Sequence, residues 1–212
     1  MNNNTILIKR KLNSNYQKYK ILVIIMTIAF ILGILFFYLI SKNNKIIVIN
    51  SIKNFFKEVA TTNNLNYTSS LINSLLVNTF YIAIIWLLGI SIIGIPIILI
   101  IMSYKAFITG FSICSIINVY HIKGILLAIA YIFPHNFIFI LILILLGFHS
   151  INFSIKLFKY LFLKKIINFK DIMKKYIKIL FICLIISLIL SLFETFISTY
   201  LIKVSLLLLK IT

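Results

Sequence analysis

Residues 21–40 read ILVIIMTIAFILGILFFYLI, an uncharged run bounded by Lys20 and Lys42. An α-helix rises about 1.5 Å per residue and the hydrocarbon core of a bilayer is about 30 Å thick, so a run of this length is sufficient to cross it. The run is longer than the apolar core of a signal peptide, and no small-x-small cleavage site follows it near Ser41. We therefore expect a retained membrane-spanning helix.

The composition of the whole chain is that of a protein whose solvent is lipid. Of its 212 residues, 62% are apolar and 11% are charged, and the mean hydropathy is +1.15. A soluble domain is about half apolar and about a quarter charged. Because so little polar surface could not cover a water-soluble globule, the composition predicts an all-α, polytopic membrane protein.

The net charge of +18 comes from 21 Lys and Arg against three Asp and Glu. In a soluble protein this balance would suggest a nucleic-acid partner. Here the basic residues fall in short clusters between long uncharged runs, as expected where they fix topology and meet anionic head groups. We therefore expect the lipid bilayer as a partner and no nucleic acid.

Uncharged runs of sufficient length predict five transmembrane helices. In chain order we expect a basic cytoplasmic N-terminus (1–20), a first span (21–40), an extracytoplasmic amphipathic helix and polar connector (41–76), a second span kinked at Gly94 and Pro96 (77–103), a third span (106–120), a fourth span (124–148), a basic cytoplasmic segment (149–178), a fifth span (179–202) and a C-terminal tail (203–212). The third run is short, which leaves a re-entrant or tilted half-helix as an alternative.

The distribution of Lys and Arg predicts the orientation. With the N-terminus in the cytoplasm, the inner segments hold fourteen basic residues, including Lys105, and the outer segments hold seven, including Lys123. The excess on the inner side favours an N-in topology, and five crossings then place the C-terminus outside. The basic segment 149–178 would lie at the anionic cytoplasmic leaflet, with a cytosolic partner as the alternative.

A segment between the first two spans has helical amphipathicity. Lys53 and Lys57 alternate with apolar residues at i, i+3, i+6, i+7 and i+10, namely Ile49, Ile52, Phe55, Phe56 and Val59. This pattern predicts an amphipathic helix on the outer face, which lies on lipid or docks a partner. Phe55 and Phe56 are the candidate partner surface.

The sequence offers little catalytic chemistry. It contains no metalloprotease, phosphate-binding or dinucleotide-binding motif, and its only acids are Glu58, Asp171 and Glu194. Cys114 and Cys183 lie inside apolar runs without a partner at metal-ligand spacing. We therefore expect no enzymatic activity, no metal and no cofactor.

Two polar residues inside predicted spans are candidate intramembrane sites. An ionisable group such as Glu194 is costly in lipid, so it reaches the interface or stays protonated, contacts another helix, or carries ions or protons. His135 follows Pro134, which frees a backbone carbonyl one turn earlier. We expect His135 or Asn136 to form a hydrogen bond with such freed groups on an adjacent helix.

Small residues at helical intervals predict close packing of the third and fourth spans. Ala106, Gly110 and Cys114 recur at i, i+4 and i+8, and Gly124 and Ala128 recur at i and i+4. Small side chains at this interval allow helix backbones to approach closely in lipid.

One segment of the chain resembles a known family. Residues 86–100 read WLLGISIIGIPIILI, with Trp86, Gly89, Ser91, Gly94 and Pro96, and this segment is similar to the signature of the stage II sporulation protein M family. The similarity continues over roughly residues 50–160, through the positions Phe55, Phe56, Lys105, Gly110, Phe111, Lys123, Gly124, Phe133, Pro134, His135 and Asn136.

The resemblance implies a function that the composition does not. It implies a membrane scaffold on the mother-cell side of the sporulation septum, in complex with stage II sporulation protein D, a lytic transglycosylase, and protein P, an amidase and endopeptidase. The chain would hold these enzymes during forespore engulfment without cutting the wall itself. The alternatives are a transporter or channel subunit, for which Glu194 is a motivating feature, and an intramembrane enzyme based on Ser91 and His135. Assembly into a homo-oligomer is left open.

Overall fold

The computed structural model describes residues 3–61, 67–162 and 168–208, and within these ranges it contains helices and no strand. Five helical segments are long and apolar enough to cross a membrane. The prediction of an all-α, polytopic membrane protein with five spans is confirmed. The N-in orientation stays a prediction.

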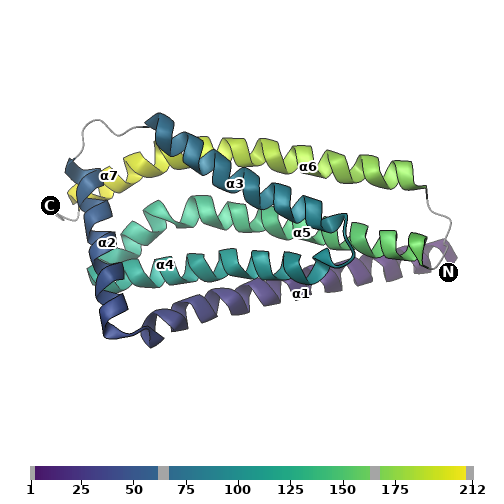
Figure 1. Ribbon diagram of the computed structural model, residues 1–212, viewed down its shortest axis with the longest axis horizontal. Coiled ribbons are helices and arrows are strands. Elements are labelled where there is room, and N and C mark those ends of the chain that lie inside the picture. Colours follow the sequence, from purple (N-terminus) through teal and green to yellow (C-terminus); the bar gives the residue numbers. More distant parts are fainter. Residues whose placement is uncertain (1–2, 62–66, 163–167, 209–212) are drawn as a thin grey trace.

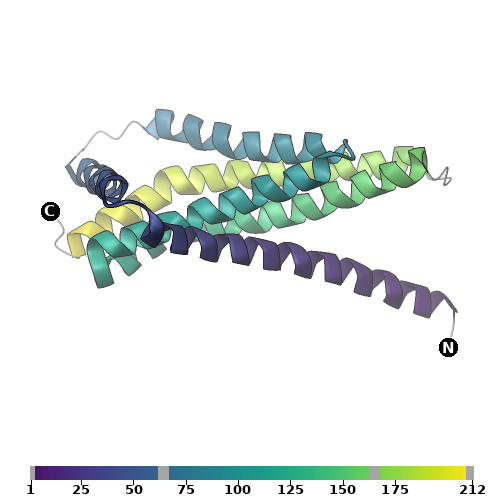
Figure 2. The ribbon, with the colours of Figure 1, turned by 60° about the horizontal axis from the view of Figure 1, so that its bottom comes forward.

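The long helices run side by side, and one shorter helix lies across an end of the bundle (Figure 1). The elements are α1 (Asn3–Leu39), α2 (Lys42–Thr61), α3 (Tyr67–Gly89), α4 (Gly94–Tyr131), α5 (Phe133–Leu161), α6 (Phe169–Leu192), the π-helical turn η1 (Phe193–Ser198) and α7 (Thr199–Leu208). Because α6, η1 and α7 follow one another directly, they form the fifth span. The two chain termini lie at opposite ends (Figures 1 and 2), and we call these the N-terminal end and the α2 end.

The predicted second span over 77–103 is wrong. The helix α3 ends at Gly89, and a tight turn leads into α4 at Gly94, so the chain reverses there rather than kinking. Pro96 falls in the first turn of α4, where a backbone N–H has no intrahelical acceptor and proline is tolerated. The third span therefore begins at Gly94 instead of 106, and Lys105 lies within it.

A second reversal occurs inside the long element α4. His121 has φ 51° and ψ −128°, which interrupts the helix. A Cβ added to Gly124 would lie 2.6 Å from the carbonyl oxygen of Ile116. In a straight helix these two residues would be more than two turns apart, so the segment after His121 folds back against the one before it.

The fourth crossing starts after this reversal and is longer than the predicted 124–148. The Ile132 N–H donates to the Ala128 carbonyl and the Asn136 N–H donates to the Ile132 carbonyl, so helical hydrogen bonds connect the end of α4 to α5. The helix α5 then continues to Leu161. The fifth span, predicted over 179–202, is likewise only the middle of a longer helical segment. Parts of the predicted connector (62–66), basic segment (163–167) and tail (209–212) lie outside the described residues.

The closest helix contact that involves the predicted small-residue stripe is between α1 and α4. A Cβ on Gly110 would overlap the carbonyl oxygen of Phe30, and a Cβ on Gly33 would overlap the carbonyl oxygen of Phe107. The expectation that Gly110 packs the third span on the fourth is therefore wrong, because this glycine faces the first span. Close approach at small residues is the usual means of packing helices in lipid.

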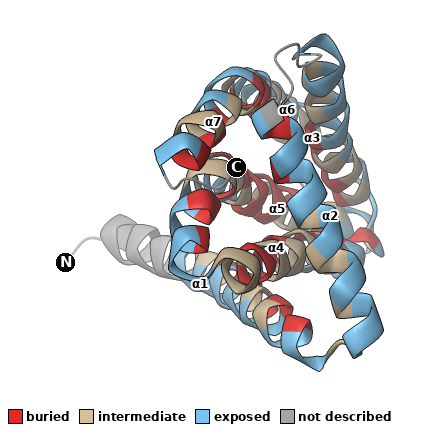
Figure 3. Ribbon diagram, turned by 90° about the vertical axis from the view of Figure 1, so that its left-hand side faces the viewer, coloured by how far each residue is buried: buried red, intermediate tan, exposed pale blue. Residues whose placement is uncertain are grey.

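Two groups of buried apolar residues hold the bundle together. The larger one includes Leu22, Ile82, Met102, Phe139 and Leu143 and joins the five spans. The smaller one lies at the α2 end and is formed by Phe56, Val59, Ile116, Leu127, Ala128, Ile132, Ile202 and Leu206. Figure 3 views this end and shows buried residues facing inward with exposed residues around them. Many exposed side chains are Ile, Leu and Phe, as expected for a surface in contact with lipid.

Candidate functional site

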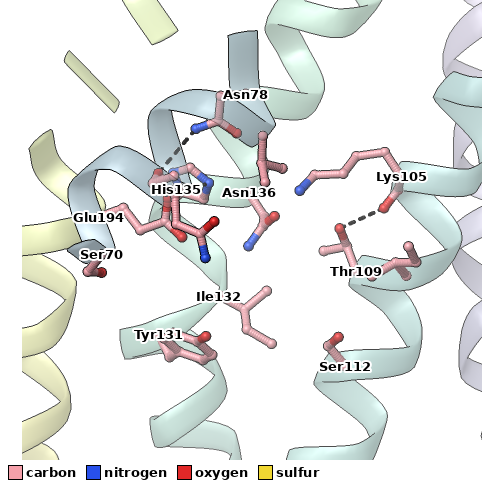
Figure 4. A pocket seen from close by; sticks show the side chains of 14 residues that line it. Ser70, Asn78, Lys105, Thr109, Ser112, Tyr131, Ile132, His135, Asn136 and Glu194 are labelled. Atoms are coloured by element: carbon pink, nitrogen blue, oxygen red, sulfur yellow. Dashed lines mark hydrogen bonds and ion pairs between the residues drawn. The ribbon is translucent and has the colours of Figure 1, made fainter. Parts of the chain in front are cut away.

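A polar pocket of about 350 Å³ lies inside the half of the bundle that is nearer to α2. Side chains from four elements, α3, α4, α5 and η1, surround it (Figure 4). The polar lining residues are Ser70, Asn73, Ser74, Asn78, Lys105, Thr109, Ser112, Tyr131, His135, Asn136 and Glu194. Such a concentration of polar groups within spans marks a candidate functional site.

Glu194 forms one side of this pocket. Its Oε2 atom accepts a hydrogen bond from the hydroxyl of Ser74 and lies 3.2 Å from Nε2 of His135. The side chain of His135 is 4% exposed and that of Glu194 is 31% exposed. The carboxyl group therefore contacts both α3 and α5.

The backbone around Glu194 is unusual. The π-helical turn η1 starts at Phe193 and interrupts a helical segment that would otherwise be regular. A π-helical turn accommodates one extra residue and changes the direction in which side chains point, and such turns are frequent at functional sites.

Asn78 extends the contacts of Glu194 into a network. Its side-chain amide donates to the Ser191 hydroxyl at 3.1 Å and to the Ser74 hydroxyl at 3.4 Å. Asn78 is buried. Hydrogen bonds between helices in lipid contribute about 1 kcal/mol each, so this network fixes the position of the Glu194 carboxyl group and stabilises the contact of α3 with α6.

Lys105 lies on the opposite side of the pocket, and its ammonium group is near Asn136 (Figure 4). The ammonium nitrogen is 5.2 Å from the ring centroid of Phe139 and 5.6 Å from that of Tyr81. Within the described ranges, no carboxylate lies within 4.0 Å of it. The prediction that Lys105 belongs to a cytoplasmic segment is wrong, because α4 begins earlier than the charge pattern indicates.

His135 and Asn136 both line the pocket. Nε2 of His135 lies beside the Glu194 carboxylate, and the ring also interacts with the backbone of Leu190 on α6, an adjacent helix. The second ring nitrogen of His135, Nδ1, is buried without a hydrogen-bond partner in the described part of the chain.

The remaining residues of the sequence signature lie away from this pocket, around the turn between α3 and α4. Trp86 stacks on Tyr176 with ring centroids 5.6 Å apart, and Gly89 lies against Tyr176 and Ser150. The carbonyl oxygen of Ser91 accepts a hydrogen bond from the Ser154 hydroxyl. These contacts join the end of α3 to α5 and α6. Ser91 and His135 are therefore not brought together.

The two candidate partner residues on α2 differ in exposure. Phe56 is 2% exposed and packs edge-on against Tyr120 and Tyr131. Phe55 is 38% exposed, and its ring centroid lies 5.2 Å from that of Tyr131. Phe56 thus attaches α2 to the bundle and is not available to a partner.

A second cavity, of about 490 Å³, lies at the N-terminal end between α1, α5 and α6. Its lining contains five lysines and no acid, namely Lys18, Lys156, Lys159, Lys175 and Lys178. Apolar side chains from α5 and α6 complete it. This placement fits the predicted contact of the basic segment with anionic lipid.

Sequence reasoning did not identify Ser74 and Asn78 as site residues. The available signal was periodicity, because Ser70, Ser74 and Asn78 follow each other at i, i+4 and i+8. Such spacing places all three on one face of a helix.

The family model described as Stage II sporulation protein M matches residues 23–199. The match covers most of the chain and includes every residue that lines the polar pocket. No curated protein and no solved structure matches the sequence.

Proposed function

The chain belongs to the stage II sporulation protein M family, and from this membership we propose that it is a scaffold that holds stage II sporulation proteins D and P at the sporulation septum. The family and the five spans make it a sporulation-related, multi-pass membrane protein. As a scaffold on the mother-cell side of the septum, it would confine two peptidoglycan-remodelling enzymes to one membrane surface during engulfment. Confinement of this kind raises the effective concentration of bound partners.

The helix α2 is the observation that supports this proposal most directly. It lies across one end of the bundle (Figure 1), and its Phe56 and Val59 side chains are buried against the bundle. The opposite face of α2 is exposed and largely polar, with Asn50, Lys53 and Asn54, and it also carries Ile46 and Ile47. A polar helix face that is fixed to the bundle on its other side is a suitable docking surface, and the predicted topology places it outside the cytoplasm, where the wall enzymes act.

The contacts in the polar pocket do not favour an enzyme. In a serine hydrolase, histidine lies between the serine and the acid. Here the acid lies between the other two groups, because Glu194 accepts from Ser74 and contacts His135. In this arrangement His135 has no hydroxyl to activate.

A transporter or channel subunit is the second candidate, and the polar pocket is the observation that favours it. The predicted kinked second span and short third span do not support this class, since α3 ends at Gly89 and a separate helix starts at Gly94. A proteoliposome flux assay with Glu194→Gln tests it, because proton coupling through this carboxyl group requires flux in the wild type and its loss in the variant.

The scaffold proposal is tested by charge substitution on α2. We would introduce Asn50→Glu, Lys53→Glu and Asn54→Glu together, affinity-purify the chain from membranes of sporulating cells, and quantify proteins D and P by mass spectrometry. We expect recovery of both enzymes to fall at least about tenfold. Three added carboxylates change both the charge and the hydrogen bonding of a docking surface, and a loss of about 1.4 kcal/mol in binding free energy is a factor of ten.

The matched control changes charge at the other end of the molecule. Lys170 and Lys174 are exposed on α6 at the N-terminal end, and Lys170→Glu with Lys174→Glu should leave recovery unchanged. Undiminished recovery of both enzymes with the α2 variant would remove this surface from the proposal.

A further inference from the structure

We propose that the polar pocket binds a small anionic group, a carboxylate or a phosphate, with the ammonium group of Lys105 as its main contact. This inference goes beyond the scaffold function, which does not use the inside of the bundle. It rests on the charge, hydrogen bonding and volume of the pocket.

Lys105 is a cation inside a membrane span, and no carboxylate of the described residues lies within 4.0 Å of its ammonium group. Its ammonium group lies over the faces of Phe139 and Tyr81. Aromatic faces stabilise a cation only in part. Charged groups within spans almost always pair with another charge or face a polar cavity, and the cavity that Lys105 faces is this pocket (Figure 4).

Glu194 does not supply the missing charge. Its carboxyl group is engaged by Ser74 and His135 on the far side of the pocket (Figure 4), and it is not within 4.0 Å of Lys105. The two groups therefore form no direct ion pair, although their charges still attract each other across the pocket.

The side chains around Lys105 supply neutral hydrogen-bond donors. Asn136 is closest in the view of Figure 4, and the hydroxyl of Ser112 and the amide of Asn73 also line the pocket. Amide and hydroxyl groups donate hydrogen bonds to carboxylate or phosphate oxygens without adding negative charge. Nδ1 of His135 is a further buried polar atom in the lining, without a hydrogen-bond partner among the described residues.

The volume suits such a ligand. A pocket of about 350 Å³ is within the size range of small-molecule sites and holds several times the roughly 30 Å³ of one water. A third cavity, of about 460 Å³ and almost wholly apolar, shares Thr109 and Ile132 with the polar pocket and lies between α1, α4 and α5. The anionic group could therefore belong to a free ion or to the head group of a lipid whose acyl chain occupies the neighbouring cavity.

The free-ion source is tested by thermal unfolding of the full-length chain in neutral detergent. Sodium phosphate and sodium acetate would be compared with sodium chloride at equal ionic strength. We expect phosphate or acetate at about a hundredfold excess over its Kd to raise the unfolding midpoint by about 5 °C. The rise should be absent in Lys105→Met and retained in Lys105→Arg.

The lipid source is tested by native mass spectrometry of the same variants with phosphatidylglycerol and phosphatidylcholine. We expect one retained phosphatidylglycerol in the wild type, and at least about tenfold less in Lys105→Met. The control is Lys53→Met, which removes an exposed lysine outside the pocket. Loss of bound phosphatidylglycerol in Lys105→Met, together with no effect of free anions on the unfolding midpoint, identifies the lipid as the source. A midpoint raised by free anions, together with no loss of bound phosphatidylglycerol, identifies the free ion.

A third variant keeps the test valid where Lys105→Met does not fold. Asn136→Leu removes a neutral donor from the pocket, and binding in whichever experiment gives a signal should weaken by about tenfold. Equal binding of phosphate and phosphatidylglycerol by the wild type and the pocket variants would overturn the proposal and leave a water-filled pocket. The absence of binding by any of these probes would overturn it as well.

Discussion

Truncation of Phe56 to Ala should release α2 from the bundle, whereas truncation of the adjacent Phe55 should have a much smaller effect. Phe56 is 2% exposed and lies among Val59, Tyr120 and Tyr131. Removal of a buried phenyl ring costs about 3–5 kcal/mol, because a cavity remains after the apolar contact is lost. We take about 3 kcal/mol, since the site is at the edge of the bundle and can partly collapse.

The matched variant at Phe55 isolates the effect of burial. Phe55 is 38% exposed and leaves no closed cavity, so only part of the transfer free energy of a phenyl ring is lost, about 1 kcal/mol. Because each 1.4 kcal/mol is a factor of ten, local opening of α2 should rise about a hundredfold for Phe56→Ala and about fivefold for Phe55→Ala.

Hydrogen–deuterium exchange of peptides from residues 42–61, followed by mass spectrometry in detergent, measures this opening directly. Peptides from α5 serve as the internal control, because α5 is held by the larger apolar cluster and should exchange at the wild-type rate. Equal acceleration by both substitutions, or none by Phe56→Ala, would show that Phe56 does not attach α2 to the bundle.

Three further changes test the packing, the second reversal and the basic cavity. Gly110→Ala should lower the amount of folded protein in size-exclusion chromatography, because its Cβ meets backbone of α1, whereas Gly147→Ala should be tolerated, because its Cβ meets the flexible end of a methionine. His121→Gly should raise the unfolding midpoint by about 3 °C. Glycine relieves the backbone strain at positive φ, and this gain exceeds the extra conformational entropy that glycine loses on folding by about 1 kcal/mol. Lys175→Gln with Lys178→Gln should weaken retention of anionic lipid in native mass spectrometry, and the same change at the two control lysines of α6 should not.

The number of spans could be predicted from sequence because lipid imposes a simple condition, about 20 apolar residues for each crossing. Their limits could not be predicted from charge alone. The turn between α3 and α4 is itself uncharged, so the run from Val59 to Tyr104 gave no sign of a reversal. Pro96 was the more informative signal of a new helix, because a proline shortly after a glycine is as typical of a helix start as of a kink.

The candidate site was less accessible to sequence reasoning. Glu194 and His135 stood out individually as polar residues in apolar runs, but they are far apart in the chain and nothing in their spacing indicates contact. The spacing of Ser74 and Asn78 predicts a polar face on α3, yet the partners of that face depend on how α3 lies against α5 and α6. Lys105 was named as a motif residue but placed in a cytoplasmic segment, because the start of the third span was predicted too late in the chain.

The polar pocket and the α2 surface are distinct requirements on one fold. A scaffold that holds partners on α2 needs spans that insert and pack, and apolar spans do this at lower cost than spans with ionisable residues. On insertion scales a central charged side chain costs about 2.5–3.5 kcal/mol, so Lys105 and Glu194 oppose insertion unless the pocket compensates them. Docking on α2 does not provide that compensation, whereas a bound anion beside Lys105 does.

The two surfaces nevertheless share one side chain, and this determines how they must be separated experimentally. Tyr131 lines the pocket and also contacts Phe55 and Phe56. Substitutions at Phe56 therefore disturb both the attachment of α2 and a wall of the pocket. The ammonium group of Lys105 lies against the rings of Tyr81 and Phe139, neither of which is on α2. Anion binding should consequently be tested at Lys105 and partner recruitment on the exposed face of α2, so that loss of one leaves the other measurable.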